Sequence, residues 1–130
     1  MKILAVDDSS TIRDLVSQTL YDSGYNDFDT AIDGLDALEK IEAEDENYDF
    51  FIVDINMPRM DGFELIQNIR NKFDYMGTPI MVLTTERSSE MKRKGREAGA
   101  TSWIVKPFEK EKFTKGIEQT LEYVNGNETY

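Results

Sequence analysis

The sequence predicts an α/β domain built on a doubly wound, five-stranded parallel sheet with five helices. Short β-prone runs alternate with longer helical patterns, and the runs begin near residues 2, 26, 49, 79 and 102. Successive starts lie 23 to 30 residues apart, which is the size of a strand–helix unit. Five such units favour a parallel sheet covered by helices on both faces, and they are too few for an eight-stranded barrel.

The first unit pairs a buried strand with an amphipathic helix. KILAV (2–6) is a continuous apolar run, as a strand buried on both faces of a sheet requires. Ser9 or Ser10 can cap the helix that follows, and Gly24 is its stop. The apolar side of this helix consists of Ile12, Leu15, Val16 and Leu20.

The second and third units repeat this order. NDFDTA (26–31) is a less apolar strand, and Asp33 starts a helix that fades into the polar segment EAEDEN. DFFIVD (49–54) is the third strand, and a loop containing Pro58 leads to a helix over residues 63–69. Both units therefore keep the strand–helix order of the first.

The last two units have the same order but weaker helical signals. PIMVLT (79–84) is the fourth strand, followed by a basic helical segment that is interrupted by Gly95 and closes at Gly99. SWIV (102–105) is the fifth strand, and residues 109–124 form the last helix.

Length and composition indicate one soluble domain. We expect residues 1–125 to form it and residues 126–130 to be a frayed C-terminal tail. No cysteine is present, which excludes disulfides and fits the cytoplasm. MKILAV is too short for a signal peptide, and no run approaches the ~20 apolar residues of a membrane span. We therefore expect a cytoplasmic chain without a membrane span.

Charge further restricts the function. The net charge of −11 argues against a nucleic-acid partner, because a protein that binds nucleic acid needs a basic surface. Residues 27–54 hold eleven acids and one base, whereas residues 86–96 hold five bases and two acids. This basic segment can steer an acidic partner.

Two absences narrow the chemistry. The sequence has no histidine, which excludes Ser-His and Cys-His catalysis and an imidazole metal site. It also has no G-x-x-x-x-G-K-[ST] loop for ATP. Any phosphoryl chemistry must therefore take its phosphate from another molecule.

Polar side chains follow four of the five predicted strands, where ligands bind in open α/β sheets. The first strand ends in Asp7 and Asp8, the third in Asp54, the fourth in Thr84 and the fifth in Lys106. Three carboxylates, a hydroxyl and an ammonium are thus predicted to converge at one edge.

This set of groups favours phosphoryl transfer. Clustered carboxylates repel one another, and oxygen ligands without sulfur or imidazole suit Mg²⁺. A carboxylate nucleophile, a divalent ion, a lysine and a hydroxyl together can accept and stabilise a phosphoryl group. Asp54 can then become an acyl phosphate.

The same residues resemble a known family. Asp7-Asp8, the segment DINMPRMDG (54–62), Thr84 and Lys106-Pro107-Phe108 are similar to the receiver domain of two-component response regulators, above all the single-domain receivers of chemotaxis. The resemblance covers essentially the whole chain. It implies a flavodoxin-like sheet with the strand order 2-1-3-4-5.

The resemblance implies a phosphoacceptor and a metal site. Asp54 would be the phosphoacceptor, and Asp8, Asp54 and the backbone carbonyl of Asn56 would bind Mg²⁺. Asp7 would assist from outside the metal's inner ligands.

It also implies roles around the phosphoryl group. Lys106 would pair with it and Thr84 would hydrogen-bond it. The Lys106–Pro107 peptide bond would be cis, and Gly62 would allow a tight turn after the phosphorylation loop.

Trp103 stands at the family's switch-aromatic position, where tyrosine or phenylalanine is usual. The implied mechanism moves Thr84 toward the phosphoryl group and rotates the aromatic side chain into the vacated space. Asn56, Glu86 and Thr85 occupy positions that modulate autodephosphorylation. The face of the fourth helix, fifth strand and fifth helix would be remodelled.

The resemblance thus implies a single-domain response regulator rather than a conventional enzyme. It would catalyse its own phosphorylation from a histidine kinase and its own dephosphorylation, with or without a separate phosphatase. Its output would be binding to a protein, with the flagellar motor switch as the chemotaxis partner. A phosphorelay intermediate or a phosphate sink would share the same site.

Two other classes fit less well. A phosphatase of the haloacid-dehalogenase type needs an aspartate two residues after the nucleophile as general acid, and Asn56 stands there. A pseudo-receiver that only binds partners would not need the complete acidic set.

Overall fold

The chain forms one parallel sheet in the order β2-β1-β3-β4-β5. The structure, a computed structural model, describes residues 1–126 apart from the side chain of Phe73. The strands are β1 (Ile3–Val6), β2 (Phe28–Ala31), β3 (Phe50–Val53), β4 (Ile80–Thr84) and β5 (Ser102–Val105). The predicted doubly wound, flavodoxin-like α/β class and its strand order are confirmed.

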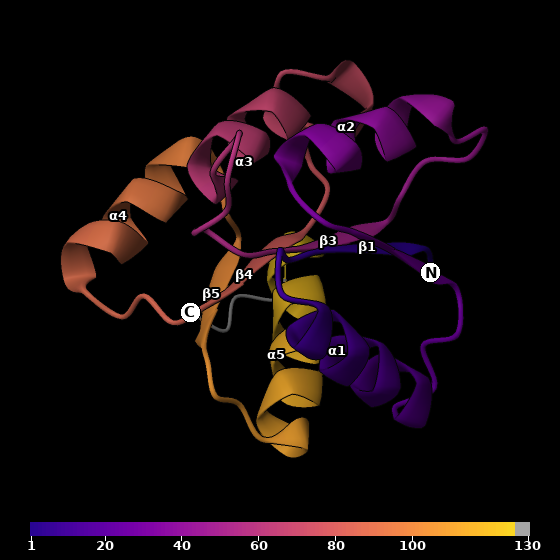
Figure 1. Cartoon of the computed structure of the whole chain (residues 1–130), viewed down its shortest axis with the longest axis vertical. Helices are drawn as coiled ribbons and strands as arrows, with labels where there is room; N and C mark the ends of the chain where they lie inside the picture. The colour runs from indigo at the N-terminus through magenta and orange to yellow at the C-terminus, as the bar shows by residue number, and fades with distance from the viewer. Residues whose placement is uncertain (127–130) are drawn as a thin grey trace.

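Helices cover both faces of the sheet (Figure 1). On one face lie α1 (Ser10–Asp22) and α5 (Lys110–Val124), and on the other lie α2 (Gly34–Ala43), α3 (Gly62–Arg70) and α4 (Ser89–Ala98). Side chains alternate between the two faces along each strand. In β1, Ile3 packs with the α1–α5 side, and Leu4 packs with the α2–α4 side.

The central strands are buried throughout, which explains their continuous apolar sequences. Every residue of β1, β3 and β4 is buried. An aromatic cluster lies on the α2–α4 side, where the ring of Phe51 is 5.8 Å from that of Tyr48 and 5.2 Å from that of Tyr75. These strands form a rigid support for the residues that follow them.

Polar side chains set the beginnings of the helices. The Ser9 hydroxyl accepts from the Ile12 amide, which selects Ser9 over Ser10 as the cap of α1. Asp33 caps α2 by accepting from the Asp36 amide. The prediction that Asp33 starts the second helix is therefore confirmed to within one residue.

One helix prediction was wrong. Gly95 does not interrupt the basic helix, because α4 continues from Ser89 to Ala98 and buries Gly95. The prediction also lacked the short 3₁₀ helix η1 (Phe73–Tyr75) before β4. Of the expected tail, residues 127–130 lie outside the described residues. Within residues 1–126, none of the helices has the length and apolarity to cross a membrane.

Candidate functional site

The carboxyl ends of β1 and β3 bring two aspartates side by side. Val6 is in register with Val53, and the Asp54 amide donates to the Val6 carbonyl at 3.0 Å. Asp7 and Asp54 follow these paired residues, so the parallel ladder itself fixes their spacing. Asp8 is exposed, whereas Asp7 and Asp54 are only 5% and 6% exposed.

Lys106 reaches both buried carboxylates from the end of β5. Its Nζ lies 2.6 Å from Asp7 Oδ2 and 3.3 Å from Asp54 Oδ2. The Lys106 amide donates to the Thr84 carbonyl at 2.8 Å, which ties the residue to the end of β4. The Lys106–Pro107 peptide bond is cis. The structure therefore brings together the groups from four strand ends that the sequence singled out.

The site carries more negative charge than Lys106 neutralises. One carboxylate oxygen each from Asp7, Asp8 and Asp54 lie within 4.8 Å of one another. Burial raises the pKa of Asp54, and the Asp7 charge adds to this rise. The Lys106 charge and hydrogen bonds from Thr84 and Ile55 oppose the rise without cancelling it.

A divalent cation fits this arrangement. Three charged carboxylates and one ammonium leave two negative charges, and the ligand atoms of the cluster are all oxygens. Mg²⁺ prefers such hard ligands and binds through one or two carboxylates while keeping several waters. The exposure of Asp8 leaves one side of the cluster open to solvent.

The loops after β3 and β4 meet beside the carboxylates. The exposed Asn56 donates from Nδ2 to Glu86 Oε1 at 3.0 Å, which bridges the two loops. Thr84 is fully buried at the end of β4, and its hydroxyl accepts from the Glu86 amide at 3.4 Å. Thr85 is exposed on the adjoining loop. Glu86 thus connects with both sides of the site.

Trp103 is linked to the same loop from β5. Its indole Nε1 donates to the Glu86 carbonyl at 2.9 Å. A Cβ on Gly95 would lie 2.6 Å from the Trp103 Cζ3 atom. The indole therefore occupies the space that the side chain of any residue other than glycine would need at position 95. Sequence reasoning missed this role of Gly95, although a glycine within a helical pattern was the available signal.

A model of the response regulator receiver domain matches residues 3–118. The chain therefore belongs to the response regulator receiver domain family. Receiver domains are signalling proteins that bind Mg²⁺ through an acidic pocket, and this chain has an acidic group, Asp7–Asp8–Asp54, that could hold a metal ion.

Chemotaxis proteins are among the most similar relatives. The chain is 41% identical over 123 residues to chemotaxis protein CheY-3 of Vibrio cholerae, covering 92% of this chain and 93% of that protein. It is 35% identical over 126 residues to chemotaxis protein CheY of Pseudomonas aeruginosa, covering 97% and 100%. A solved structure of Vibrio cholerae CheY4 matches with a TM-score of 0.85 and 47% identity, covering 92% and 97%. The chain is thus a CheY-like receiver.

Proposed function

We propose that this receiver is a switch of chemotaxis type that a histidine kinase phosphorylates on Asp54. The observation that carries the proposal is the position of Asp54, buried at the end of β3 between the Asp7 carboxylate and the Lys106 ammonium. In the step proposed, an Asp54 carboxylate oxygen bonds to phosphorus while the bond to the donor's imidazole nitrogen breaks.

The acidic cluster is the proposed Mg²⁺ site. Asp8, Asp54 and the Asn56 backbone carbonyl would hold Mg²⁺, and Asp7 would act from outside the inner ligands. When bound, Mg²⁺ supplies positive charge that stabilises the phosphoryl oxygens. The pairing of Lys106 with Asp7 holds its ammonium next to the acceptor, where it can pair with the phosphoryl group.

The residues of the two loops are proposed to set the lifetime and the readout of phosphorylation. Asn56 and Glu86 bridge the loops, and Thr85 stands beside them, so all three can control how water reaches the acyl phosphate. A shift of Thr84 toward the phosphoryl group would pull on the Glu86 amide. Because Glu86 accepts from Trp103, the indole would respond.

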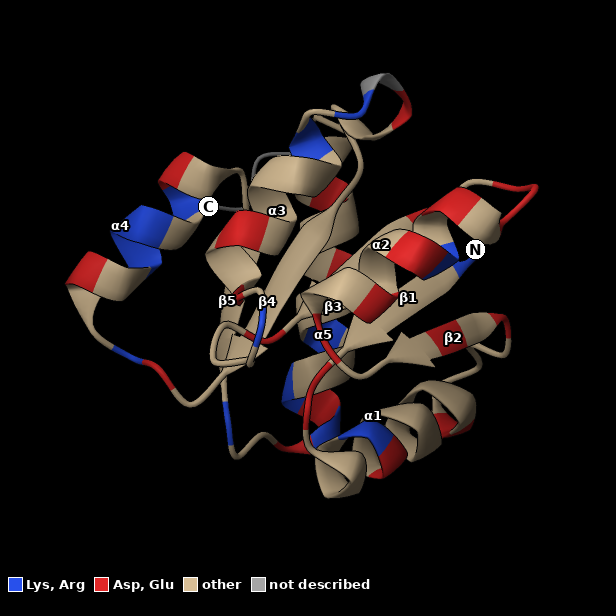
Figure 2. Cartoon of the chain, turned by 45° about the horizontal axis from the view of Figure 1, so that its top comes forward, with Lys and Arg blue, Asp and Glu red and all other residues tan. Residues whose placement is uncertain are grey.

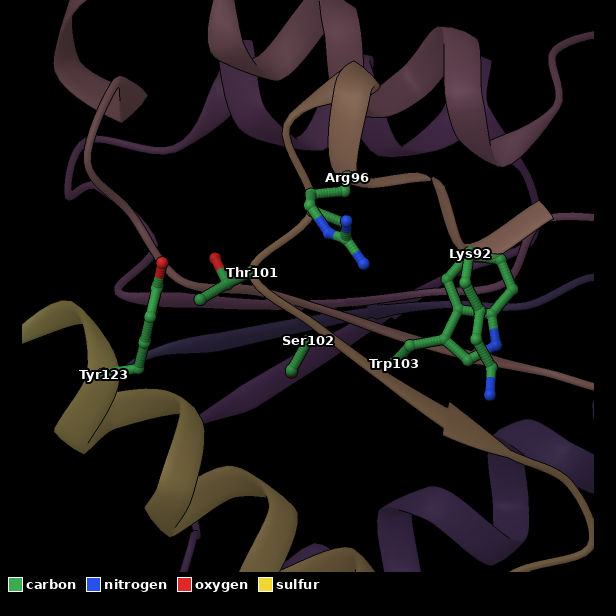
Figure 3. A pocket seen from close by; sticks show the side chains of 7 residues that line it. Lys92, Arg96, Thr101, Ser102, Trp103 and Tyr123 are labelled. Atoms are coloured by element: carbon green, nitrogen blue, oxygen red, sulfur yellow. The ribbon is translucent and has the colours of Figure 1, made fainter. Parts of the chain in front are cut away.

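The output surface is proposed to be the α4–β5–α5 face. A pocket of about 370 Å³ lies there, and its lining side chains converge from all three elements (Figure 3). Lys92 and Arg96 give it positive charge, and Trp103 and Tyr123 give it aromatic surface. Basic residues gather on α4, in a chain that is otherwise acidic (Figure 2). An acidic segment of a protein such as the flagellar motor switch suits this face.

The first test is labelling by a small phosphodonor. We expect Asp54→Asn to abolish Mg²⁺-dependent labelling while the fold is retained, and Asp45→Asn to label normally, because Asp45 is exposed outside the site. Labelling of the Asp54→Asn protein at the normal rate would contradict the assignment.

The second test follows the switch. A metal-fluoride mimic of the phosphoryl group should change Trp103 fluorescence only when Mg²⁺ is present, because the indole is joined to the Glu86 loop. Asp54→Asn is the matched control. An unchanged spectrum at saturating mimic would remove Trp103 from the switch.

A further inference from the structure

The loop between β3 and α3 contains a backbone conformation that non-glycine residues rarely adopt. Arg59 has a φ of 67° and is the only non-glycine residue with positive φ among residues 1–126. The Met60 amide donates to the Pro58 carbonyl at 2.7 Å, which closes a three-residue turn around Arg59. A conformation of this kind persists where the surroundings hold it in place.

An ion pair to another part of the chain holds this turn. Arg59 Nε donates to Asp33 Oδ2 at 2.8 Å, and its Nη2 donates to the same oxygen. Asp33 is only 3% exposed, and its other oxygen accepts from the Asp36 amide at 2.9 Å. Burial raises the pKa of Asp33, but the hydrogen bonds from Asp36 and Arg59 outweigh this effect. The net pKa is lowered, so the carboxylate is charged at neutral pH.

A packing contact and a backbone hydrogen bond hold the loop on either side of Arg59. A Cβ on Gly34 would lie 2.8 Å from Met60 Cγ and Sδ, so the turn rests directly on the start of α2. At the base of the loop, the Gly62 amide donates to the Ile55 carbonyl at 2.8 Å. The loop is thus closed at its base and anchored at its tip, with Asn56 between these two points.

We infer that Arg59 is a positioning residue that sets the affinity of the acidic site for Mg²⁺. Through its ion pair with Asp33, it fixes the loop that presents the Asn56 carbonyl. Arg59 acts at a distance, because its guanidinium is turned toward α2 and bound there. This inference rests on the proposed function only in assuming that Asn56 and the aspartates bind the metal.

Calorimetric titration of the unphosphorylated protein with MgCl₂ tests the inference. We expect Arg59→Ala and Asp33→Asn each to weaken Mg²⁺ binding about tenfold, as loss of a residue that orients a ligand does. The double variant should bind Mg²⁺ no more weakly than either single variant, because each single substitution already removes the same ion pair. Arg93→Ala is the control, since it removes an exposed ion pair to Glu97 on α4.

Hydrogen exchange in metal-free protein supplies a second measurement. Loss of the ion pair should speed exchange of the Met60 and Gly62 amides and leave the strand amides unchanged, which also shows that the variants are folded. Arg59→Gly should also exchange faster than the unsubstituted protein, because glycine accepts the positive φ but cannot bind Asp33.

The outcomes separate this inference from the proposed function. If the unsubstituted protein does not bind Mg²⁺, or if the Asp54→Asn variant binds Mg²⁺ equally well, the proposed metal site is wrong. If Asp54→Asn weakens binding but folded Arg59→Ala and Asp33→Asn bind like the unsubstituted protein, the role of Arg59 alone is overturned.

Discussion

The centre of the sheet and its β5 edge differ in how firmly they are packed. Strands β1, β3 and β4 are buried at every position, whereas β5 is only half-buried at each of its four residues. The adjoining α4 buries only Gly95 and Ala98. A firmly packed region therefore carries the buried carboxylates, and a loosely packed region carries Trp103 and the basic helix.

Under the proposed function, this difference would let one small domain keep its phosphorylation site rigid while the surface around Trp103 changes. Regions with few buried apolar contacts open and shift at lower free energy than the core. The attachments of α4 include the contact of Gly95 with the indole and the ammonium of Lys94 over the Phe63 ring, 4.8 Å from its centre. Contacts of this kind can be exchanged without breaking the sheet.

The largest expected effect on stability lies in the firmly packed centre of the sheet. Phe51→Ala should lower the free energy of unfolding by about 3–5 kcal/mol, because Phe51 is fully buried between two aromatic rings. Ile104→Ala on β5 should cost about 1–2 kcal/mol, less than the usual range for a fully buried isoleucine. Urea denaturation measures both, and equal losses would contradict the proposed contrast.

An effect of intermediate size is expected at the carboxylate cluster, and its sign depends on pH. The pKa of Asp54 is raised in the folded protein, so its charge destabilises the fold above that pKa. Asp54→Asn should therefore be more stable than the unsubstituted protein at pH 7. This gain in stability should shrink as the pH falls from the raised pKa of Asp54 toward the ordinary value of 3.8.

Stability curves with and without MgCl₂ check this prediction. Saturating Mg²⁺ should stabilise the unsubstituted protein more than Asp54→Asn and narrow the gap at pH 7, because bound ligand stabilises the folded state. A gap that is constant from pH 7 to pH 4 would show that the charge of Asp54 is not its cause.

The smallest expected effect on stability lies in the loosely packed region of α4 and β5. Gly95→Ala gains about 1 kcal/mol of helix propensity, but its methyl group would displace the Trp103 ring. We expect a net loss of about 1 kcal/mol, with tryptophan emission shifted to longer wavelength as the indole becomes exposed. Ser89→Ala, at the exposed start of α4, is the control. An unshifted emission spectrum would show that the indole does not rest on Gly95.

The α/β class could be predicted because its sequence signals are local, whereas the strand order came from the resemblance to the receiver family. Continuous apolar runs mark the strands that are buried on both faces, and their spacing marks the helices between them. The convergence of Asp7, Asp54 and Lys106 was equally predictable, since parallel strands end at the same edge.

What the sequence did not reveal depends on residues far apart in the chain. Gly95 looked like an interruption because nothing in its neighbourhood shows that Trp103 packs on it. Arg59 and Asp33 are 26 positions apart, and neither the ion pair nor the positive φ has a local sequence signal, since glycine or asparagine is the usual residue in that conformation.

The sheet divides the interior into two apolar clusters, one on each face. Alternate side chains of each strand belong to opposite clusters, so the two clusters have only the strand backbone in common. If the surface around Trp103 is the proposed output surface, side chains there could change and alter the binding specificity while the packing of α1 against the opposite face stays as it is. Recognition and foldability can then diverge at different evolutionary rates within one small chain.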